Sequence, residues 1–371
     1  MNRVPGFWTS ARRVGPALTV VVAVGLLGAC SGDNGSQLRG SILTGAGATF
    51  AMPLITLWAS EYQAAEGARV NYNSIGSGGG IRAHTDRTVD FGASEAPLTV
   101  EQFERAPGTL HLPFTIGTVA MAYNVPGVEE LRLSGEALAG IFLGEITRWN
   151  DPVLRELNPD ESLPDQRITV VHRSDGSGTT YVFTEYLTKI SDAWADRVGY
   201  STSVAWPVGI GGNGNEGVAG AIRNNPGSLG YVELSYVESL GLPAASVLNR
   251  EGNFVLPSLE GGTAAAAEVV NDLPAGHEPW HEVSFTDAPG PDSYPISSFS
   301  YFLVYENLDV LGGQMTRERA ERIVRWIEWT VTEGQEYNKA VRNAALPEQL
   351  RALNLETLSR IRFDGEQVKT W

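Results

Sequence analysis

The segment from Arg173 to Thr180, Arg-Ser-Asp-Gly-Ser-Gly-Thr-Thr, constrains the fold more than any other part of the chain. A β-type run at 168–172 precedes it, and apolar residues at helical spacings follow it. The segment is therefore predicted to be a glycine-rich turn between a strand and a helix. Glycine allows backbone N–H groups to approach a ligand closely, and the first turn of a helix has N–H groups without partners. Such a turn can bind an anion. Arg173 adds a positively charged guanidinium group, whose paired N–H donors suit a tetrahedral oxyanion. The alternative is a capped surface turn with an Arg–Asp pair.

Two earlier segments have the same character. Residues 44–50, Thr-Gly-Ala-Gly-Ala-Thr-Phe, precede a helical pattern with Pro53 in its first turn, where proline is tolerated. Residues 75–81, Ile-Gly-Ser-Gly-Gly-Gly-Ile, follow an alternating run typical of a strand. Neither segment has the Gly-Lys-Ser/Thr ending of a P-loop, which argues against nucleotide binding. The hydroxyl donors of the three predicted junctions are Thr49, Ser77, Ser177 and Thr179.

The first residues are predicted to be a targeting segment. Arg3, Arg12 and Arg13 form a positive region, and 17–27 is an apolar stretch too short to span a membrane comfortably. It ends in Leu-Gly-Ala-Cys, a small-residue cleavage site followed by Cys30, the single cysteine of the chain. This pattern resembles the lipobox of bacterial lipoproteins. We therefore predict a signal peptide over 1–29, lipidation of Cys30 and a flexible tether over 30–40; a plain secretory signal is the alternative.

Length and charge limit the classes of protein. From Cys30 onward 342 residues remain, which suggests two domains. Loss of the three leader arginines changes the net charge from −16 to −19, so nucleic acid is not an expected partner. An anion site must then rely on local N–H and hydroxyl donors against an unfavourable overall field.

Strand-like and helical patterns alternate along the chain, which indicates an α/β fold. Strands are predicted at 89–93, 112–123, 168–172, 229–232 and 296–304, and helices at 136–142, 179–190, 216–224 and 317–335. Extended segments near 115–123 and 295–302 are candidates for crossings between two lobes. We predict that lobe I is discontinuous, with residues 41–117 and 297–371, and that lobe II contains residues 118–296.

Seven ordered segments together resemble one family, the phosphate-binding lipoproteins of ABC phosphate importers (PstS type). They are 44–50, 75–79, 89–98, 141–149, 171–179, 206–217 and 226–233. The resemblance implies the type II periplasmic-binding-protein fold, in which two α/β lobes joined by crossover strands close on a ligand in the cleft. It also implies a monomer that binds inorganic phosphate outside the cell membrane and delivers it to a permease with a cytoplasmic ATPase. No catalytic activity, cofactor or metal is implied.

The resemblance also implies a set of phosphate-binding residues. They are Thr49, Phe50, Ser77, Glu95, Arg173, Ser177, Gly178 and Thr179, with Asp175 holding Arg173 by an ion pair. The family usually has Asp where this chain has Glu95.

That difference bears on selectivity. Phosphate carries one or two protons near neutral pH, and a buried carboxylate can accept a hydrogen bond from P–OH. Sulfate has no such proton and would meet an unpaired acceptor of like charge. Glu95 keeps the acceptor but adds a methylene, so it reaches the ligand by another rotamer or points away. Asp90 is a possible substitute, and a solvated surface acid is the alternative interpretation of Glu95.

Other motifs in the sequence point to functions other than phosphate transport. Residues 277–281, His-Glu-Pro-Trp-His, match a zinc-protease pattern, but Pro279 opposes the helix that the pattern needs. His172 is predicted to be structural, and Ser177 lacks the Gly-x-Ser-x-Gly nucleophile motif. The alternatives that stay open are a binding protein for sulfate, arsenate or molybdate, a phosphatase on the same fold, and a phosphate sensor or surface antigen that does not transport.

Overall fold

A computed structural model describes residues 42–313 and 315–368, which belong to one compact unit. The predicted signal peptide, the tether and Cys30 lie outside the described residues. No helix of the described part is long and apolar enough to cross a membrane.

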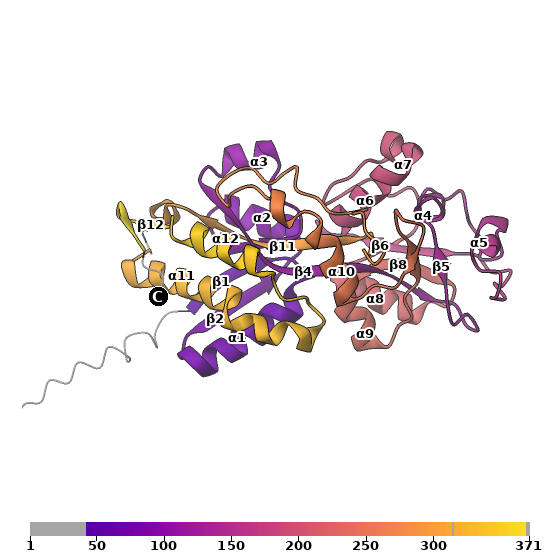
Figure 1. The fold of residues 1–371 in the computed structure, drawn as a ribbon, viewed down its shortest axis with the longest axis horizontal. Helices are drawn as coiled ribbons and strands as arrows, with labels where there is room; N and C mark the ends of the chain where they lie inside the picture. Colours follow the sequence, from indigo (N-terminus) through magenta and orange to yellow (C-terminus); the bar gives the residue numbers. More distant parts are fainter. Residues whose placement is uncertain (1–41, 314, 369–371) are drawn as a thin grey trace, which may run out of the picture. The chain divides into compact units, whose positions relative to one another are not determined.

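An eight-stranded sheet with the order β2-β1-β3-β11-β4-β8-β6-β7 runs through the unit (Figure 1). Two smaller sheets have the orders β10-β9-β5 and β12-β13. The strands are β1 (Ile42–Gly47), β2 (Arg69–Ser74), β3 (Phe91–Ser94), β4 (Thr109–Asn124), β5 (Arg132–Leu133), β6 (Thr169–Arg173), β7 (Ile210–Gly212), β8 (Ser228–Glu233), β9 (Ser246–Leu248), β10 (Phe254–Val255), β11 (Ser297–Tyr305), β12 (Arg362–Phe363) and β13 (Glu366–Gln367).

Two long strands occupy the centre of the large sheet. β4 has 16 residues; its first part pairs antiparallel with β11, and its last part, from Val119, pairs antiparallel with β8. On one side β1 pairs in parallel with β2 and β3, and on the other β6 pairs in parallel with β7 and β8. The extended segments predicted near 115–123 and 295–302 therefore lie side by side in β4 and β11. The exact lobe boundaries stay a prediction.

Helices cover the sheet (Figure 1). They are α1 (Met52–Glu66), α2 (Ser77–Thr85), α3 (Val100–Arg105), α4 (Gly135–Phe142), α5 (Pro152–Leu157), α6 (Gly178–Ile190), α7 (Asp192–Arg197), α8 (Gly214–Asn224), α9 (Leu234–Leu240), α10 (Leu259–Ala267), α11 (Arg317–Val331) and α12 (Glu348–Leu358), with 3₁₀ turns η2 (Val270–Asp272), η3 (Leu308–Leu311) and η4 (Glu333–Val341). The predicted α/β alternation is confirmed. The helix predicted over 317–335 is too long: α11 ends at Val331, and a 3₁₀ segment follows.

All three predicted strand–glycine–helix junctions are present: β1 leads to α1, β2 to α2 and β6 to α6. α1 has Pro53 in its first turn and ends at Gly67, whose φ of 71° is left-handed. α6 begins after Ser177, whose hydroxyl accepts a hydrogen bond from the backbone N–H of Thr180 at 3.0 Å. The cap satisfies one of the free N–H groups and leaves those of Gly178 and Thr179 available.

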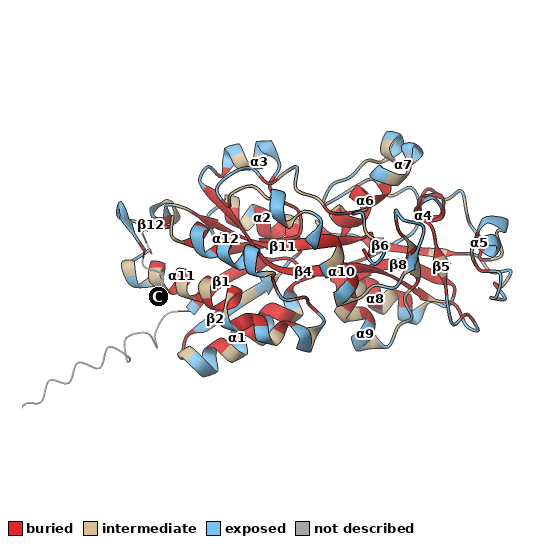
Figure 2. Ribbon diagram, viewed as in Figure 1, coloured by how far each residue is buried: buried red, intermediate tan, exposed pale blue. Residues whose placement is uncertain are grey.

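The strands of the large sheet are largely buried, and the helices place one face against them (Figure 2). Trp326 of α11 is fully buried, and its ring lies 5.0 Å from Tyr62 of α1 and 6.3 Å from Phe91 of β3. Burial of such side chains contributes about 1.5–3 kcal/mol each or more. This packing holds in place α1 and β3, whose other ends carry the first site residues.

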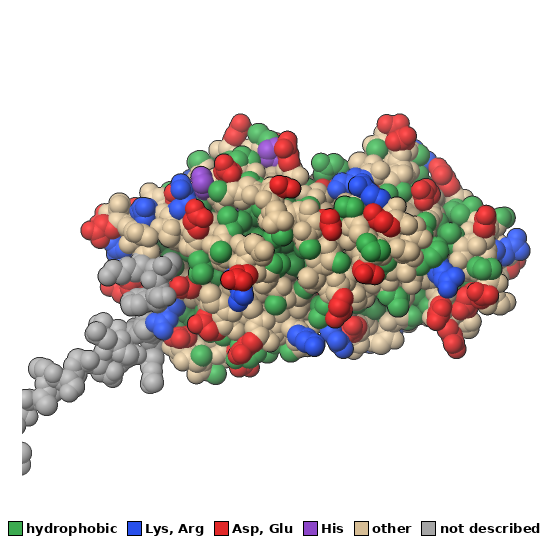
Figure 3. All heavy atoms as spheres, in the orientation of Figure 1, with side chains coloured by type: hydrophobic (Ala, Val, Ile, Leu, Met, Phe, Trp, Pro, Cys, Tyr) green, Lys and Arg blue, Asp and Glu red, His purple; other side chains and the backbone are tan. Residues whose placement is uncertain are grey.

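On the face shown in Figure 3, Lys and Arg side chains lie singly or in small groups among Asp and Glu side chains. That face has no extended basic surface of the kind that binds nucleic acid. The distribution agrees with the acidic composition of the chain.

Candidate functional site

The second and third glycine turns contact each other directly. The N–H of Gly78 donates to the carbonyl oxygen of Gly176 at 3.0 Å. Gly76 has a φ of 78°, and a Cβ there would lie 2.3 Å from the same carbonyl oxygen. Only glycine permits this approach. The turns after β2 and β6, about 100 residues apart in sequence, therefore form one site.

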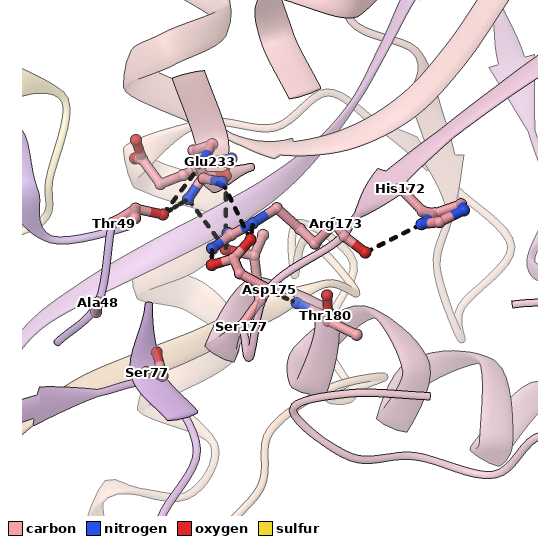
Figure 4. Close-up of polar contacts among 12 residues, drawn as sticks. Ala48, Thr49, Ser77, His172, Arg173, Asp175, Ser177, Thr180 and Glu233 are labelled. Atoms are coloured by element: carbon pink, nitrogen blue, oxygen red, sulfur yellow. Dashed lines mark hydrogen bonds and ion pairs between the residues drawn. The ribbon is translucent and has the colours of Figure 1, made fainter. Parts of the chain in front are cut away.

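Arg173 is the last residue of β6, and its side chain is 1% exposed. Its Nε donates to Asp175 Oδ1 at 2.8 Å and its Nη2 to Asp175 Oδ2 at 2.5 Å, which is a two-point ion pair (Figure 4). Asp175 also accepts the N–H of Gly214 at 3.1 Å. Burial alone would raise the pKa of Asp175, but the Arg173 guanidinium outweighs it, and the pKa lies below its ordinary value. Arg173 is thus held in one orientation as a buried cation.

The hydroxyl of Thr179 contacts this guanidinium, and Asn215 links it to the hydroxyl of Thr49. Thr179 Oγ1 is 3.3 Å from Arg173 Nη1. Both Thr49 Oγ1 and Thr179 Oγ1 accept hydrogen bonds from the side-chain Nδ2 of Asn215, at 2.9 Å and 3.1 Å. The Tyr236 hydroxyl of α9 donates to the carbonyl oxygen of Thr49 at 2.6 Å. These contacts join the first glycine turn to the third.

Glu95 follows β3 and is 1% exposed, so its interpretation as a solvated surface acid is wrong. Its Oε2 accepts from Ser77 Oγ at 2.8 Å and its Oε1 from Ser300 Oγ of β11 at 3.0 Å. A Cβ at Gly178 would lie 2.2 Å from Oε2, so the carboxylate lies at the first residue of α6. Burial raises the pKa of Glu95 to about 7, against the lowering effect of the two serine hydroxyls and Arg173. The extra methylene therefore brings the carboxylate into the group of donors.

Asp90 does not join this group. Both of its oxygens pair with Arg319 of α11 at 2.8 Å, and Oδ2 also accepts from the N–H of Thr44. Asp90 precedes β3 and Glu95 follows it, so the two acids lie at opposite ends of the strand. The alternative role for Asp90 is therefore not supported.

The remaining predicted residues contribute mainly through the backbone. The Phe50 ring is buried against Gly117 of β4, where a Cβ would lie 2.3 Å from it. Ser177 caps α6 with its hydroxyl oxygen. Among the hydrogen bonds found in 42–313 and 315–368, none uses the N–H of Phe50, Ser77, Gly178 or Thr179 as a donor. These N–H groups are therefore free to bind an anion.

Sequence reasoning missed three residues that the structure places here: Asn215, Tyr236 and Ser300. A signal for Asn215 was present, because the glycine-rich segment 211–217, which covers the end of β7 and the start of α8, is a fourth junction of the same type. No local pattern distinguishes Ser300, because its role depends on the pairing of β11 with β3.

The competing motif at 277–281 lies in turns and irregular structure, as Pro279 predicted. No group of three or more His, Cys, Asp or Glu among the described residues could hold a metal ion. His172 stacks on Trp206 at 4.9 Å, and its Nδ1 lies 3.0 Å from the carbonyl oxygen of Arg173. In Figure 4 it lies on the side of Arg173 away from Asp175 and Thr49, in agreement with a structural role.

Comparisons with known proteins agree with this geometry. The family model described as "PBP superfamily domain" matches residues 31–332. The phosphate-binding protein PstS of Haemophilus influenzae is 42% identical over 301 residues, which cover 79% of this chain and 85% of that protein. Among solved structures, the phosphate-binding protein from Stenotrophomonas maltophilia has a TM-score of 0.65 at 19% identity and covers 87% of this chain and 100% of its own. The ABC-type phosphate transport receptor from Vibrio cholerae has a TM-score of 0.53 at 18% identity, covering 82% and 100%. The predicted periplasmic-binding-protein fold is confirmed.

Proposed function

The chain belongs to the PstS family of phosphate-binding proteins, and we propose that it binds inorganic phosphate and delivers it to an ABC importer. The observation that carries the proposal is the buried Arg173 guanidinium, held by Asp175 beside the hydroxyl of Thr179, which Asn215 links to the hydroxyl of Thr49. A single buried cation surrounded by neutral donors suits a small oxyanion better than an extended substrate.

The proposed site binds the anion through donors from each glycine turn. Arg173 supplies the charge, the hydroxyls of Thr49 and Thr179 supply two donors, and the free N–H groups at the starts of α2 and α6 supply more. Helix N-termini add a partial positive charge. Together these groups replace the water around the ligand in a site that is closed to solvent.

Glu95 supplies the acceptor that selects a protonated anion. Hydrogen phosphate can donate its P–OH to the carboxylate, whereas sulfate has no proton to donate. The two serine hydroxyls on Glu95 orient its oxygens without a second cation to neutralise them. We therefore expect the site to bind phosphate and arsenate more tightly than sulfate.

Entry and release of the ligand require the turns to separate. Arg173, Ser77 and Thr179 are each at most 3% exposed. The hydrogen bond from Gly78 to Gly176 joins the second turn to the third, and we expect it to open when phosphate enters. A few hydrogen bonds worth about 0.5–1.5 kcal/mol each hold the turns together, which permits release to a partner.

The proposed setting is the outer side of the cytoplasmic membrane. Lipid on Cys30 would attach the monomer there, on the extracellular or periplasmic side, next to the permease and its cytoplasmic ATPase. The chain would act by binding alone, with no reaction and no cofactor.

Isothermal titration of the purified, phosphate-free protein with phosphate, arsenate and sulfate tests the proposal. We expect one tight site for phosphate and arsenate and much weaker binding of sulfate. Binding of sulfate with equal affinity would contradict the role of Glu95, and the absence of any phosphate binding would contradict the function.

A further inference from the structure

Asn215, the second residue of α8, joins two hydroxyls of the proposed site. Its Nδ2 donates to Thr49 Oγ1 at 2.9 Å and to Thr179 Oγ1 at 3.1 Å, and its backbone N–H donates to Thr49 Oγ1 at 3.2 Å. The side chain is fully buried. Thr49 and Thr179 come from junctions about 130 residues apart, and Asn215 is the residue that contacts both.

The backbone fixes which way the amide of Asn215 faces. Its Oδ1 accepts the N–H of Glu233 at 3.0 Å, so the NH₂ group must face the two threonines. The Thr179 hydroxyl donates to the same Oδ1 at 3.5 Å, the longest contact of the group, and a bound anion would replace this weak acceptor. Gly214, with a φ of 69°, gives the preceding turn the left-handed conformation that directs the N–H of Asn215 inward.

The donors on each threonine determine what its hydroxyl can do. A hydroxyl has two lone pairs and one proton. Thr49 Oγ1 receives two donors from Asn215, and Thr179 Oγ1 receives one from Asn215 and one from Arg173. All acceptor positions are then filled, and each hydroxyl has only its proton to offer.

We propose that Asn215 is a positioning residue of the anion site, which turns the hydroxyls of Thr49 and Thr179 into dedicated donors to the bound phosphate. This inference rests on the proposed function. Asn215 does not itself touch the ligand. It acts through the two threonines and joins the first glycine turn to the third when the site is closed.

The test compares phosphate dissociation constants for the wild type, Asn215→Asp, Asn215→Ala and a matched control, Asn158→Asp. Asn158 is also buried; its Oδ1 accepts a backbone N–H at 2.7 Å and its Nδ2 donates to two carbonyl oxygens. Thermal unfolding without phosphate checks that each variant folds. We expect both Asn215 variants to bind phosphate about 10-fold or more weakly, and Asn158→Asp to bind as the wild type does.

Two further readouts separate positioning from general structure. Thr179→Val removes one of the two hydroxyls. In a protein with that change, Asn215→Asp should reduce the phosphate affinity by a smaller factor than it does in the wild type. At lower pH the introduced carboxyl becomes protonated and regains one donor, so the affinity ratio of wild type to Asn215→Asp should fall.

The inference is overturned if the wild type binds phosphate but the Asn215 variants bind it equally well. It is also overturned if the changes in phosphate binding free energy caused by Asn215→Asp and by Thr179→Val add up to the change measured in the double variant. A wild type that does not bind phosphate at all overturns the proposed function instead, so the two failures are distinguishable.

Discussion

Replacement of Glu95 by Gln should weaken the preference for phosphate over sulfate. The substitution keeps the length of the side chain and exchanges a pure acceptor for a group that accepts and donates. The hydroxyls of Ser77 and Ser300 now donate to the carboxylate, and one of them can rotate to accept from the introduced amide. The fold should therefore tolerate the change.

The magnitude follows from two effects of opposite sign on the two anions. A hydrogen bond from phosphate to a carboxylate is worth about 1.5–3 kcal/mol, against about 0.5–1.5 kcal/mol for a neutral acceptor. Two like charges about 4 Å apart repel by about 4 kcal/mol at an effective dielectric constant near 20, and the nearby Arg173 reduces this for sulfate. We expect the selectivity to fall by about 1–3 kcal/mol, roughly a 5- to 150-fold change in the ratio of dissociation constants.

The assay is titration calorimetry with phosphate and sulfate at fixed pH. Glu95→Asp restores the family's residue and should keep the selectivity. Glu185→Gln is the matched control, because Glu185 is also buried and its Oε2 accepts from two hydroxyls, those of Ser284 and Thr286, outside the site. This control should have the same ratio of phosphate to sulfate dissociation constants as the wild type.

The pH dependence adds a second check on Glu95. Because burial raises its pKa to about 7, the carboxyl holds its own proton at about pH 6 and there resembles glutamine. The difference between wild type and Glu95→Gln should therefore be larger at about pH 8.5 than at about pH 6. If the Gln variant has the same ratio of phosphate to sulfate dissociation constants as the wild type at both pH values, Glu95 is not the acceptor of the phosphate proton.

Four other results are expected. Arg173→Ala should weaken phosphate binding at least tenfold in titration, because truncation of a buried charge partner costs about 2–5 kcal/mol; unchanged affinity would remove the central residue of the site. Cys30→Ser should abolish lipidation. A variant that has lost its signal peptide and still partitions wholly into membranes would contradict the prediction that Cys30 belongs to a lipobox. Phosphomonoesters should not be hydrolysed with or without zinc; turnover that disappears on replacement of His277 or His281 would revive a metalloenzyme. Burial raises the pKa of Glu233 to about 8, so the folded state keeps a proton that the unfolded chain releases. Below about pH 6.5 the buried His84 and His111, whose pKa values burial lowers to about 3, act in the opposite direction, because the unfolded chain binds protons there that the folded state does not. The unfolding temperature of the phosphate-free protein should thus fall as the pH rises from about 6.5 to about 8, and Glu233→Gln should flatten this fall; a rise over this range would contradict it.

The junctions could be predicted from the sequence because their signals are local. Glycine, a hydroxyl residue and a change from strand to helix periodicity lie within a few residues of each other at 44–50, 75–81 and 173–180. The Arg173–Asp175 pair is equally local, since its partners are two positions apart in the sequence. The pairing of the turns is not local, and the family resemblance supplied it.

The contacts that shape the site depend on tertiary structure. Ser300 reaches Glu95 only because β11 pairs with β3, and Asn215 reaches Thr49 only because α8 begins beside the first turn. The family pattern left the direction of the Glu95 side chain open, because an added methylene permits several rotamers. Because the direction of Glu95 is open in the sequence, Asp90 is an alternative acceptor for the phosphate proton. Only the position of Arg319 in the folded chain shows that the oxygens of Asp90 are already bound.

A crystal structure of the protein with bound phosphate tests the proposed binding site. We expect one phosphate within hydrogen-bond distance of Arg173, Thr49 and Thr179, with its P–OH toward Glu95. Phosphate bound elsewhere, for example in the cavity of about 340 Å³ lined by Arg82 and Arg105, with the Arg173 site left without it, would show that these residues do not form the phosphate site.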